Sequence, residues 1–407
     1  MRAILYVNLN DRIPENRTLI DAVKIVADLN PDFIWMGFEY GAVLSLPESE
    51  ETAYKQYLKA GYPPKVAERL AAEAKKRGYH YKSLRDQITK LKKVLPHVDF
   101  NGAIHPQYVY YHMWNDITLK PYSNDEIESM VLDLSKWGLP YDKRRTQEMF
   151  RKFIGYGFYS DLTNEEFQRL ILSRVKRFAD CGVDSIWYDM LFAQALLIYR
   201  YITKDAKHKA VTESFEAAVE LIYKTKKYVD KVGTWSGFLF LKHINPNLPS
   251  PEIDFITENP QPNEVRNLRF NKNFWIALKR LRDKFIPSAT VMVTPDWGPG
   301  CGHMMNVFSQ ELTPQQQCQF MRIWKDFCDK MGFVPVFPVH GGNLGEEGKC
   351  LKKKSYGKHN KYDALAPEFN TYDCIKSLMV KDYKVLLLAA IIGAILAAIG
   401  LGRWCQK

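Results

Sequence analysis

Eight short apolar runs, separated by longer stretches with helical spacing, constrain this sequence more than any other feature. Between the runs, apolar residues recur at three- and four-residue intervals, as at Leu19, Val23 and Val26, which is the pattern of amphipathic helices. Strands and helices that alternate in this way predict β/α units around a parallel sheet. We therefore expect one α/β domain, a (β/α)8 barrel of the TIM type, over residues 1–380. The runs are residues 3–9, 32–38, 99–104, 184–188, 233–240, 253–257, 290–294 and 334–339.

A doubly wound open sheet is the main alternative for such a pattern. That fold favours a glycine-rich phosphate-binding turn after the first strand, whereas this chain has Asn8-Leu9-Asn10-Asp11 there. The barrel is therefore preferred. Two connections are long, residues 113–166 after the third strand and 341–363 after the eighth, and such insertions usually shape or cover a substrate cleft. The second is rich in lysine and glycine, so we expect an exposed, mobile loop.

The C-terminal end of the sequence predicts a membrane anchor. Residues 385–402 contain no charged or strongly polar side chain, and as a helix they would be roughly 27 Å long, enough to cross a bilayer. Residues 381–384 would form a short basic linker before this transmembrane helix, and residues 403–407 a short tail. Because the first residues cannot form a signal peptide, we expect a single-pass, tail-anchored protein with its barrel in the cytoplasm.

Charge and cysteine content exclude several classes of function. The formal net charge is +11, but basic and acidic residues are mixed along the chain, so we expect a solvated surface and no nucleic-acid partner. The number of cysteines is odd and none forms a Cys-x-x-Cys pair, which predicts reduced, mostly buried thiols rather than disulfides or a zinc site. The seven are Cys181, Cys301, Cys318, Cys328, Cys350, Cys374 and Cys405.

Two carboxylates at predicted strand ends are the candidate catalytic groups. Alternation along strand four places Ser185, Trp187 and Asp189 on one face, so Asp189 can point into the barrel mouth. The same argument in strand six aligns residues 254, 256 and 258, with Glu258 at the rim. Active sites of these barrels lie at this end of the strands.

The segment Cys-Gly-Val-Asp-Ser-Ile-Trp-Tyr-Asp-Met at 181–190 resembles the fourth β/α unit of glycoside hydrolase barrels of the α-galactosidase and α-amylase type. In those enzymes the pattern Gly-[Val/Phe]-Asp-Gly-x-x-x-Asp ends in the catalytic nucleophile. The resemblance implies that Asp189 is the nucleophile and that Glu258 is the acid/base. Two departures weigh on this assignment: Ser185 stands where glycine is usual, and the α-galactosidase type has aspartate after strand six.

Glycoside hydrolysis needs two carboxyl groups across the scissile bond, and aromatic rings near strand ends can stack on sugars. We therefore predict a membrane-tethered glycoside hydrolase that acts on a carbohydrate or glycoconjugate, without cofactor or metal. The candidate substrate-binding residues are Glu39, His105, Trp187, Trp235, Asp296, Trp297 and His340.

Two other functions fit the same barrel. A metal-dependent hydrolase would need convergent ligands such as His105, Asp189 and His340, but the amidohydrolase type has His-x-His on strand one, where this chain has Asn8-Leu9-Asn10. A non-catalytic carbohydrate-binding barrel would keep the aromatic residues without needing a carboxylate pair. Burial of Asp189 or Glu258 away from solvent would favour that last possibility.

Overall fold

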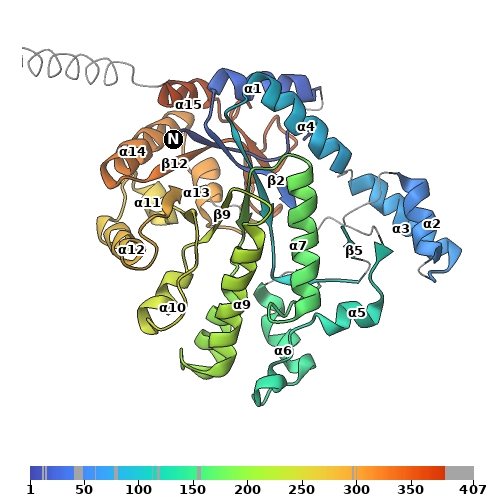
Figure 1. Ribbon diagram of the computed structural model, residues 1–407. Helices are drawn as coiled ribbons and strands as arrows, with labels where there is room; N and C mark the ends of the chain where they lie inside the picture. Colours follow the sequence, from blue (N-terminus) through green and yellow to red (C-terminus); the bar gives the residue numbers. More distant parts are fainter. Residues whose placement is uncertain are drawn as a thin grey trace, which may run out of the picture.

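The computed structural model describes residues 1–11, 13, 16–40, 49–59, 61–77, 81–111, 113–116, 120–153, 157–295, 298 and 300–380. In this part of the chain eight parallel strands form a closed ring, because β1 pairs with both β2 and β12 (Figure 1). The predicted barrel is confirmed, and each apolar run overlaps one barrel strand. The strands are β1 (Ala3–Tyr6), β2 (Phe33–Tyr40), β3 (Asp99–Ile104), β8 (Ser185–Tyr188), β9 (Lys231–Trp235), β10 (Phe255–Glu258), β11 (Thr290–Val293) and β12 (Val334–Asn343).

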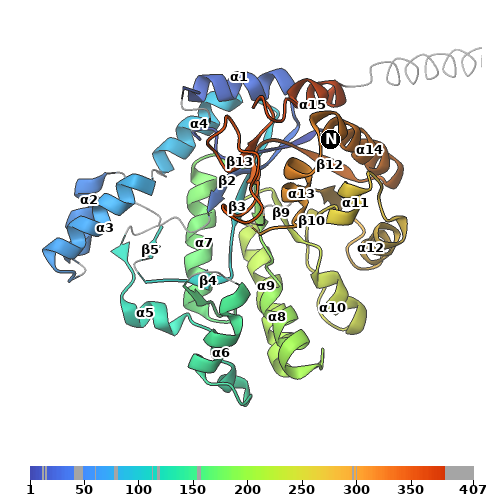
Figure 2. The same ribbon diagram turned by 180° about the vertical axis from the view of Figure 1, so that it is seen from behind.

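Alternation along the strands divides the core into two layers. Leu5, Trp35 and Trp187 belong to the cluster that fills the barrel, while Ile4 and Ile186 pack in the layer under the helices. That outer layer is covered by α1 (Leu19–Leu29), α4 (Tyr81–Val94), α7 (Glu165–Asp180), α9 (Lys209–Thr225), α10 (Phe238–Ile244), α12 (Lys272–Phe285), α14 (Pro314–Met331) and α15 (Tyr372–Met379) (Figures 1 and 2).

Three aspartates at the amino ends of barrel strands each link two neighbouring strands. Each lies directly before a barrel strand and accepts a backbone N–H from the start of the neighbouring barrel strand or from the residue just before it, and each also pairs with a cation. The N–H to carboxylate distances are 2.8 Å for Arg2 to Asp32, Phe100 to Asp184 and Val232 to Asp254. The cations are Arg2, Lys92 and Lys226 respectively.

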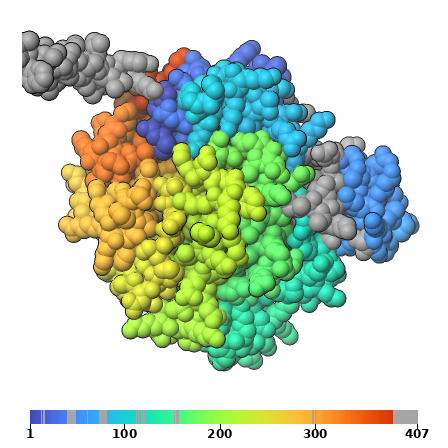
Figure 3. Space-filling view, viewed as in Figure 1, coloured from blue at the N-terminus to red at the C-terminus, as the bar shows by residue number. Residues whose placement is uncertain are grey.

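A helical hairpin follows β2 and was not identified from the sequence. It consists of α2 (Glu50–Lys59) and α3 (Pro64–Arg77), and it protrudes from the side of the barrel (Figures 1 and 3). It has a small core of its own, made by Ala53, Tyr57, Ala67, Leu70 and Ala71.

The long insertion predicted after the third strand is confirmed. It contains β4 (Tyr108–Val109), β5 (Trp114–Asn115), β6 (Lys120–Pro121), α5 (Asn124–Ser129), η1 (Leu134–Trp137), α6 (Lys143–Phe150), η2 (Arg151–Phe153) and β7 (Phe158–Tyr159). A buried ion pair between Arg174 Nε and Asp116 Oδ2, 3.5 Å apart, fixes this insertion to α7.

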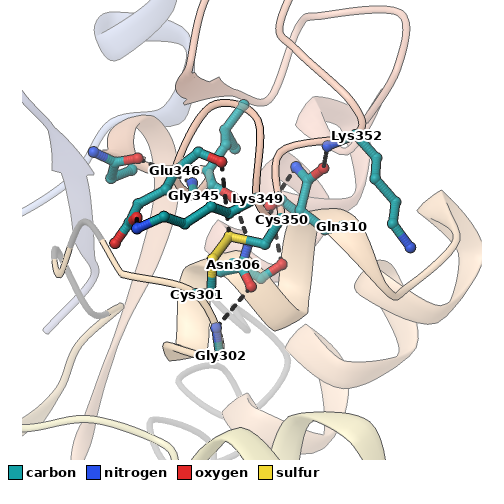
Figure 4. The surroundings of a disulfide bond; sticks show 12 residues. Cys301, Gly302, Asn306, Gln310, Gly345, Glu346, Lys349, Cys350 and Lys352 are labelled. Atoms are coloured by element: carbon teal, nitrogen blue, oxygen red, sulfur yellow. Dashed lines mark hydrogen bonds and ion pairs between the residues drawn. A yellow bond between two sulfur atoms is a disulfide. The ribbon is translucent and has the colours of Figure 1, made fainter.

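The insertion after the eighth strand is anchored to the barrel by several contacts, while Glu347, Lys349 and Lys352 are exposed, as expected. Its mobility stays a prediction. Its end forms β13 (Lys361–Asp363), which pairs antiparallel with β12. Its middle lies against α13 (Met304–Gln310), where Asn306 Nδ2 donates to the Leu344 carbonyl at 2.7 Å and a disulfide joins Cys301 to Cys350 (Figure 4). Gln310 also accepts two backbone N–H groups of this segment, at 2.7 and 2.8 Å. Lysine and glycine content indicated exposure, but these contacts depend on residues far away in the sequence.

The prediction of reduced cysteines is wrong for four of the seven residues. A second disulfide joins Cys318 on α14 to Cys374 on α15, and in both pairs the Cα atoms lie less than 6 Å apart, at 5.7 and 5.8 Å. Cys181 and Cys328 are free and buried, as expected. The paired cysteines are 49 and 56 residues apart and are brought together by the packing of the seventh and eighth β/α units, so their spacing gave no signal.

In the part of the chain described above, no helix has the length and apolar character needed to cross a membrane. The predicted linker 381–384, span 385–402 and tail 403–407 lie outside the described residues.

Candidate functional site

Asp189 lies at the carboxyl end of the fourth barrel strand, as predicted. Its backbone N–H donates to the Ile104 carbonyl at 3.0 Å, which extends the ladder between β3 and β8. Because Trp187 is part of the barrel interior, Asp189 also faces inward at the mouth. Its side chain is 28% exposed, and Oδ2 lies 3.0 Å from His105 Nδ1, the distance of a hydrogen bond in which the imidazole donates.

The chain turns sharply after Asp189. Met190 has φ of 47°, in the left-handed region that few side chains adopt, and such strain is found at functional sites more often than elsewhere. Neighbouring strands hold the turn, since Thr234 Oγ1 donates to the Tyr188 carbonyl at 2.7 Å and Gln107 donates to the Asp189 carbonyl. Both ends of the Asp189 peptide unit are therefore fixed, which orients the carboxylate.

Tryptophans form the floor below this carboxylate. The Trp187 ring meets Trp35 edge to face, with centroids 5.2 Å apart, and its Nε1 donates to Thr257 Oγ1 at 3.0 Å. Only 6% of Trp187 is exposed, so it supports the mouth from below. Trp235 is half-buried at the rim and lies against Gly237, where any side chain would clash with the indole.

Glu258 lies at the end of the sixth strand, but the predicted facing of that strand is wrong. Phe255 lies in the barrel interior and Thr257 bonds Trp187 there, whereas Ile256 packs under the helices. Glu258 is in phase with Ile256, and Asp254 lies at the opposite end of the barrel. The Glu258 carboxylate is 8% exposed and accepts hydrogen bonds from Ser236 Oγ at 2.5 Å and from the Asn259 N–H at 3.1 Å.

His340 is buried below the barrel mouth. Its position therefore does not support the prediction that it binds substrate. It is 1% exposed, with Nδ1 2.8 Å from Asp363 and Nε2 3.3 Å from Asp11. Arg17 pairs with the same Asp363 at 2.5 Å, and Lys361 pairs with Asp11 at 2.9 Å. The network therefore links the β1 loop to β12 and β13.

The charges of this network shift one another's proton affinities. Burial works against a charged His340, but its hydrogen bonds to Asp11 and Asp363 raise its pKa above the ordinary value. Burial alone would raise the pKa of both carboxyls, yet His340, Lys361 and Arg17 hold them below their usual range. The two carboxylates thus stabilise the protonated form of His340.

Three remaining candidates cannot be placed. Asp296 and Trp297 lie outside the described residues, as does the side chain of Glu39, whose backbone pairs with Ala103 near the end of β2. Sequence reasoning also missed Gln107 and Ser236, which contact Asp189 and Glu258. Gln107 lies three residues after the predicted third strand and Ser236 lies within the predicted fifth run, so neither position stood out in the sequence.

In the described ranges, no group of three or more His, Cys, Asp or Glu side chains is arranged to hold a metal ion. His105 and His340 instead contact different carboxylates, Asp189 in the first case and Asp11 and Asp363 in the second. The three ligands that a metal-dependent hydrolase would need therefore do not form one described cluster.

No protein-family model matches the sequence, and no curated protein sequence matches it either. Among solved structures, the chain is similar to an alpha-amylase from Anoxybacillus, with 8% identity, a TM-score of 0.51, and 93% of this chain and 77% of that chain covered. The chain is also similar to an alpha-amylase from Geobacillus thermoleovorans, with 8% identity, a TM-score of 0.48, and 93% of this chain and 77% of that chain covered. A GH27 β-L-arabinopyranosidase from Geobacillus stearothermophilus aligns as well (10% identity, 93% and 75% covered, TM-score 0.41).

The chain is thus a (β/α)8 barrel, similar in fold to an alpha-amylase barrel. At this identity the likeness establishes the fold, while the chemistry has to be argued from the residues at the mouth.

Proposed function

We propose that this chain is a glycoside hydrolase in which Asp189 is the nucleophile or transition-state stabiliser. One observation carries the proposal: a partly exposed carboxylate at the end of the fourth strand, oriented by His105 and by a fixed turn, above a floor of tryptophans. Active sites of such barrels lie at this end of the strands. Similarity of fold to an alpha-amylase supports the same class of reaction.

Glu258 is the proposed acid/base. It belongs to the same rim, but both of its carboxylate oxygens accept hydrogen bonds and little of it is exposed. To donate a proton, the carboxyl has to leave Ser236 when substrate binds. A separation of about 5–5.5 Å between the two carboxyl groups in the substrate complex would give retention of configuration, and about 6.5–9.5 Å would give inversion.

Turnover of activated aryl glycosides by the Asp189→Asn variant tests the nucleophile. The amide keeps the shape and removes the charge, so kcat should fall by about a thousandfold or more, equivalent to about 4 kcal/mol, while the melting temperature stays unchanged. Asp180→Asn, at the end of α7 below the barrel, is the matched control and should retain full activity. Equal turnover by D189N and the parent would assign Asp189 to a structural role.

Leaving-group dependence tests the acid/base separately. Glu258→Gln should slow glycosides with poor leaving groups much more than those with activated ones, because only the former need a proton. The burial of Glu258 is the observation that favours a non-catalytic carbohydrate-binding barrel. That alternative gains if E258Q and D189N both bind sugars as the parent does and no aryl glycoside is hydrolysed by any of the three.

We also propose that residues 385–402 anchor the barrel to a membrane and that the barrel faces an oxidising compartment. The length and apolar character of this segment support the anchor. Two disulfides, with both remaining described cysteines buried, favour an oxidising compartment over the cytoplasm. Protease added to intact cells should therefore digest the barrel, and a barrel protected until the cells are lysed would reverse the orientation.

A further inference from the structure

A strip of exposed aromatic and basic side chains lies outside the site described above. We define the aromatic–basic strip by six residues on η2, on α10 and on η3 (Ile198–Thr203), a short π-helix that continues α8 (Ala193–Leu197). Its most exposed rings are Phe153 at 37%, Tyr201 at 42% and Phe240 at 53%. The six residues are Arg151, Phe153, Tyr199, Arg200, Tyr201 and Phe240.

The strip is continuous although its three segments are far apart in the sequence. The Phe153 and Tyr201 ring centroids are 5.5 Å apart, which joins η2 to η3, and those of Tyr199 and Phe240 are 6.2 Å apart, which joins η3 to α10. Figure 2 shows α6, α8 and α10 along the lower end of the molecule. A large ligand could therefore contact all three segments at once.

The strip lies on connections that leave the same end of the barrel strands as the mouth. Its segments follow the third, fourth and fifth barrel strands, so they belong to the connections at the carboxyl ends, where Asp189 lies. The helix that bears Tyr199 and Tyr201 begins at Ala193, four residues after Asp189. A chain held on the strip would thus extend from the proposed catalytic carboxylate.

The charged residues of the strip, Arg151 and Arg200, are both basic, and their guanidinium groups are available to bind an anionic ligand. In the described part of the chain, no carboxylate lies within ion-pair distance of Arg151 or Arg200, whereas the neighbouring Arg144 pairs with Glu148 at 3.0 Å. Arg200 lies over the Tyr201 ring, 5.8 Å from its centroid. Arg151 also lines a hollow of about 490 Å³, whose other charged residues form two ion pairs, Lys143 with Glu128 and Arg144 with Glu148.

We propose that the aromatic–basic strip binds an anionic polysaccharide, carboxylated or sulfated, and leads it to the mouth. Aromatic faces stack on the apolar faces of sugar rings, and a guanidinium binds a carboxylate or sulfate through two parallel hydrogen bonds. The inference rests on the proposed glycosidase function and assigns it a substrate class. Nucleic acid and anionic lipid share the charge, but the position of the strip at the mouth end of the barrel favours a glycan.

Affinity electrophoresis of the parent barrel tests the proposal, with polygalacturonate, heparin or neutral dextran in the gel. We expect retardation in one or both anionic gels, weakening with salt, and none in dextran. The double variants Tyr201→Ala/Phe240→Ala and Arg151→Gln/Arg200→Gln should each weaken binding at least tenfold. Tyr223→Ala, which removes a ring 61% exposed on α9, is the matched control and should bind as the parent does.

The outcomes separate this inference from the proposed function. Both double variants should hydrolyse small aryl glycosides within twofold of the parent, and D189N should still be retarded. The proposed glycan binding by the strip is refuted if the double variants bind as the parent does or if dextran retards the parent equally. It is also refuted if the parent binds single-stranded DNA or phosphatidylserine vesicles more tightly than the anionic polysaccharides. A parent that hydrolyses aryl glycosides but does not bind either anionic gel would also overturn the strip and leave the glycosidase standing. A parent that binds an anionic gel but hydrolyses no aryl glycoside would remove the glycosidase alone, and a fully active D189N would remove only the proposed role of Asp189.

Discussion

Replacing Cys318 and Cys374 by serine should destabilise the barrel by about 4 kcal/mol. The disulfide joins residues 56 apart, and closing a loop of that size in the unfolded chain costs about 4 kcal/mol by loop entropy. Both side chains are half-buried, so serine should fit with little added cost. With an unfolding entropy of about 2 cal/mol/K per residue, this corresponds to a fall of roughly 5 °C in melting temperature.

Differential scanning calorimetry without reductant measures this change, with the Cys301→Ser/Cys350→Ser variant beside it. That second disulfide closes a loop of similar size, 49 residues apart, so its loss should cost about as much. Adding reductant breaks both disulfides of the parent, so it should bring the parent below either variant. The reasoning is refuted if maleimide labels all seven cysteines of the unfolded, unreduced parent, or if both variants melt with the parent.

The remaining predictions concern the two ends of the barrel. Asp184→Ala leaves the Phe100 N–H without its acceptor and should cost about 1–3 kcal/mol in urea unfolding, whereas Asp180→Ala on α7 should change stability by less than about 0.5 kcal/mol. His340 has a raised pKa when folded, so its stabilising effect is complete below about pH 6.5 and is lost as pH rises through the folded value. The urea concentration at which half of the parent is unfolded should therefore decline as pH rises above about 6.5. The His340→Asn variant should lack this decline. If the parent and the variant showed the same dependence of this midpoint on pH, the His340 ring would not titrate in that range.

The barrel could be predicted because its signal is local. Each strand is a short apolar run, and the spacing of apolar residues in the intervening stretches marks the helices. The fifth run was extended too far for the same reason: β9 ends at Trp235, and the apolar residues from Phe238 onward begin α10. An apolar run buried on all sides looks the same in a strand and in a helix.

The site could be predicted only in part, because its orientation depends on neighbouring strands. Asp189 follows from alternation within its own strand. Glu258 was assigned the wrong phase because both faces of β10 are buried and apolar side chains occur on each, so the pattern does not show which face lies inside. The contacts of His340 with Asp11 and Asp363 join distant segments, and no local pattern indicates them.

The pairing of β1 on both sides has a consequence for synthesis. Ala3 is bonded to Phe33 on one side and to Val336 on the other, so one edge of the first strand stays unpaired until the last strand has been made. At roughly 5–20 residues per second, translation of the intervening three hundred or so residues takes tens of seconds. Throughout that time the nascent chain presents an open, apolar strand edge, the kind of surface on which chains aggregate and chaperones bind. Production of this protein should therefore depend on chaperone supply more than on the stability of the finished barrel.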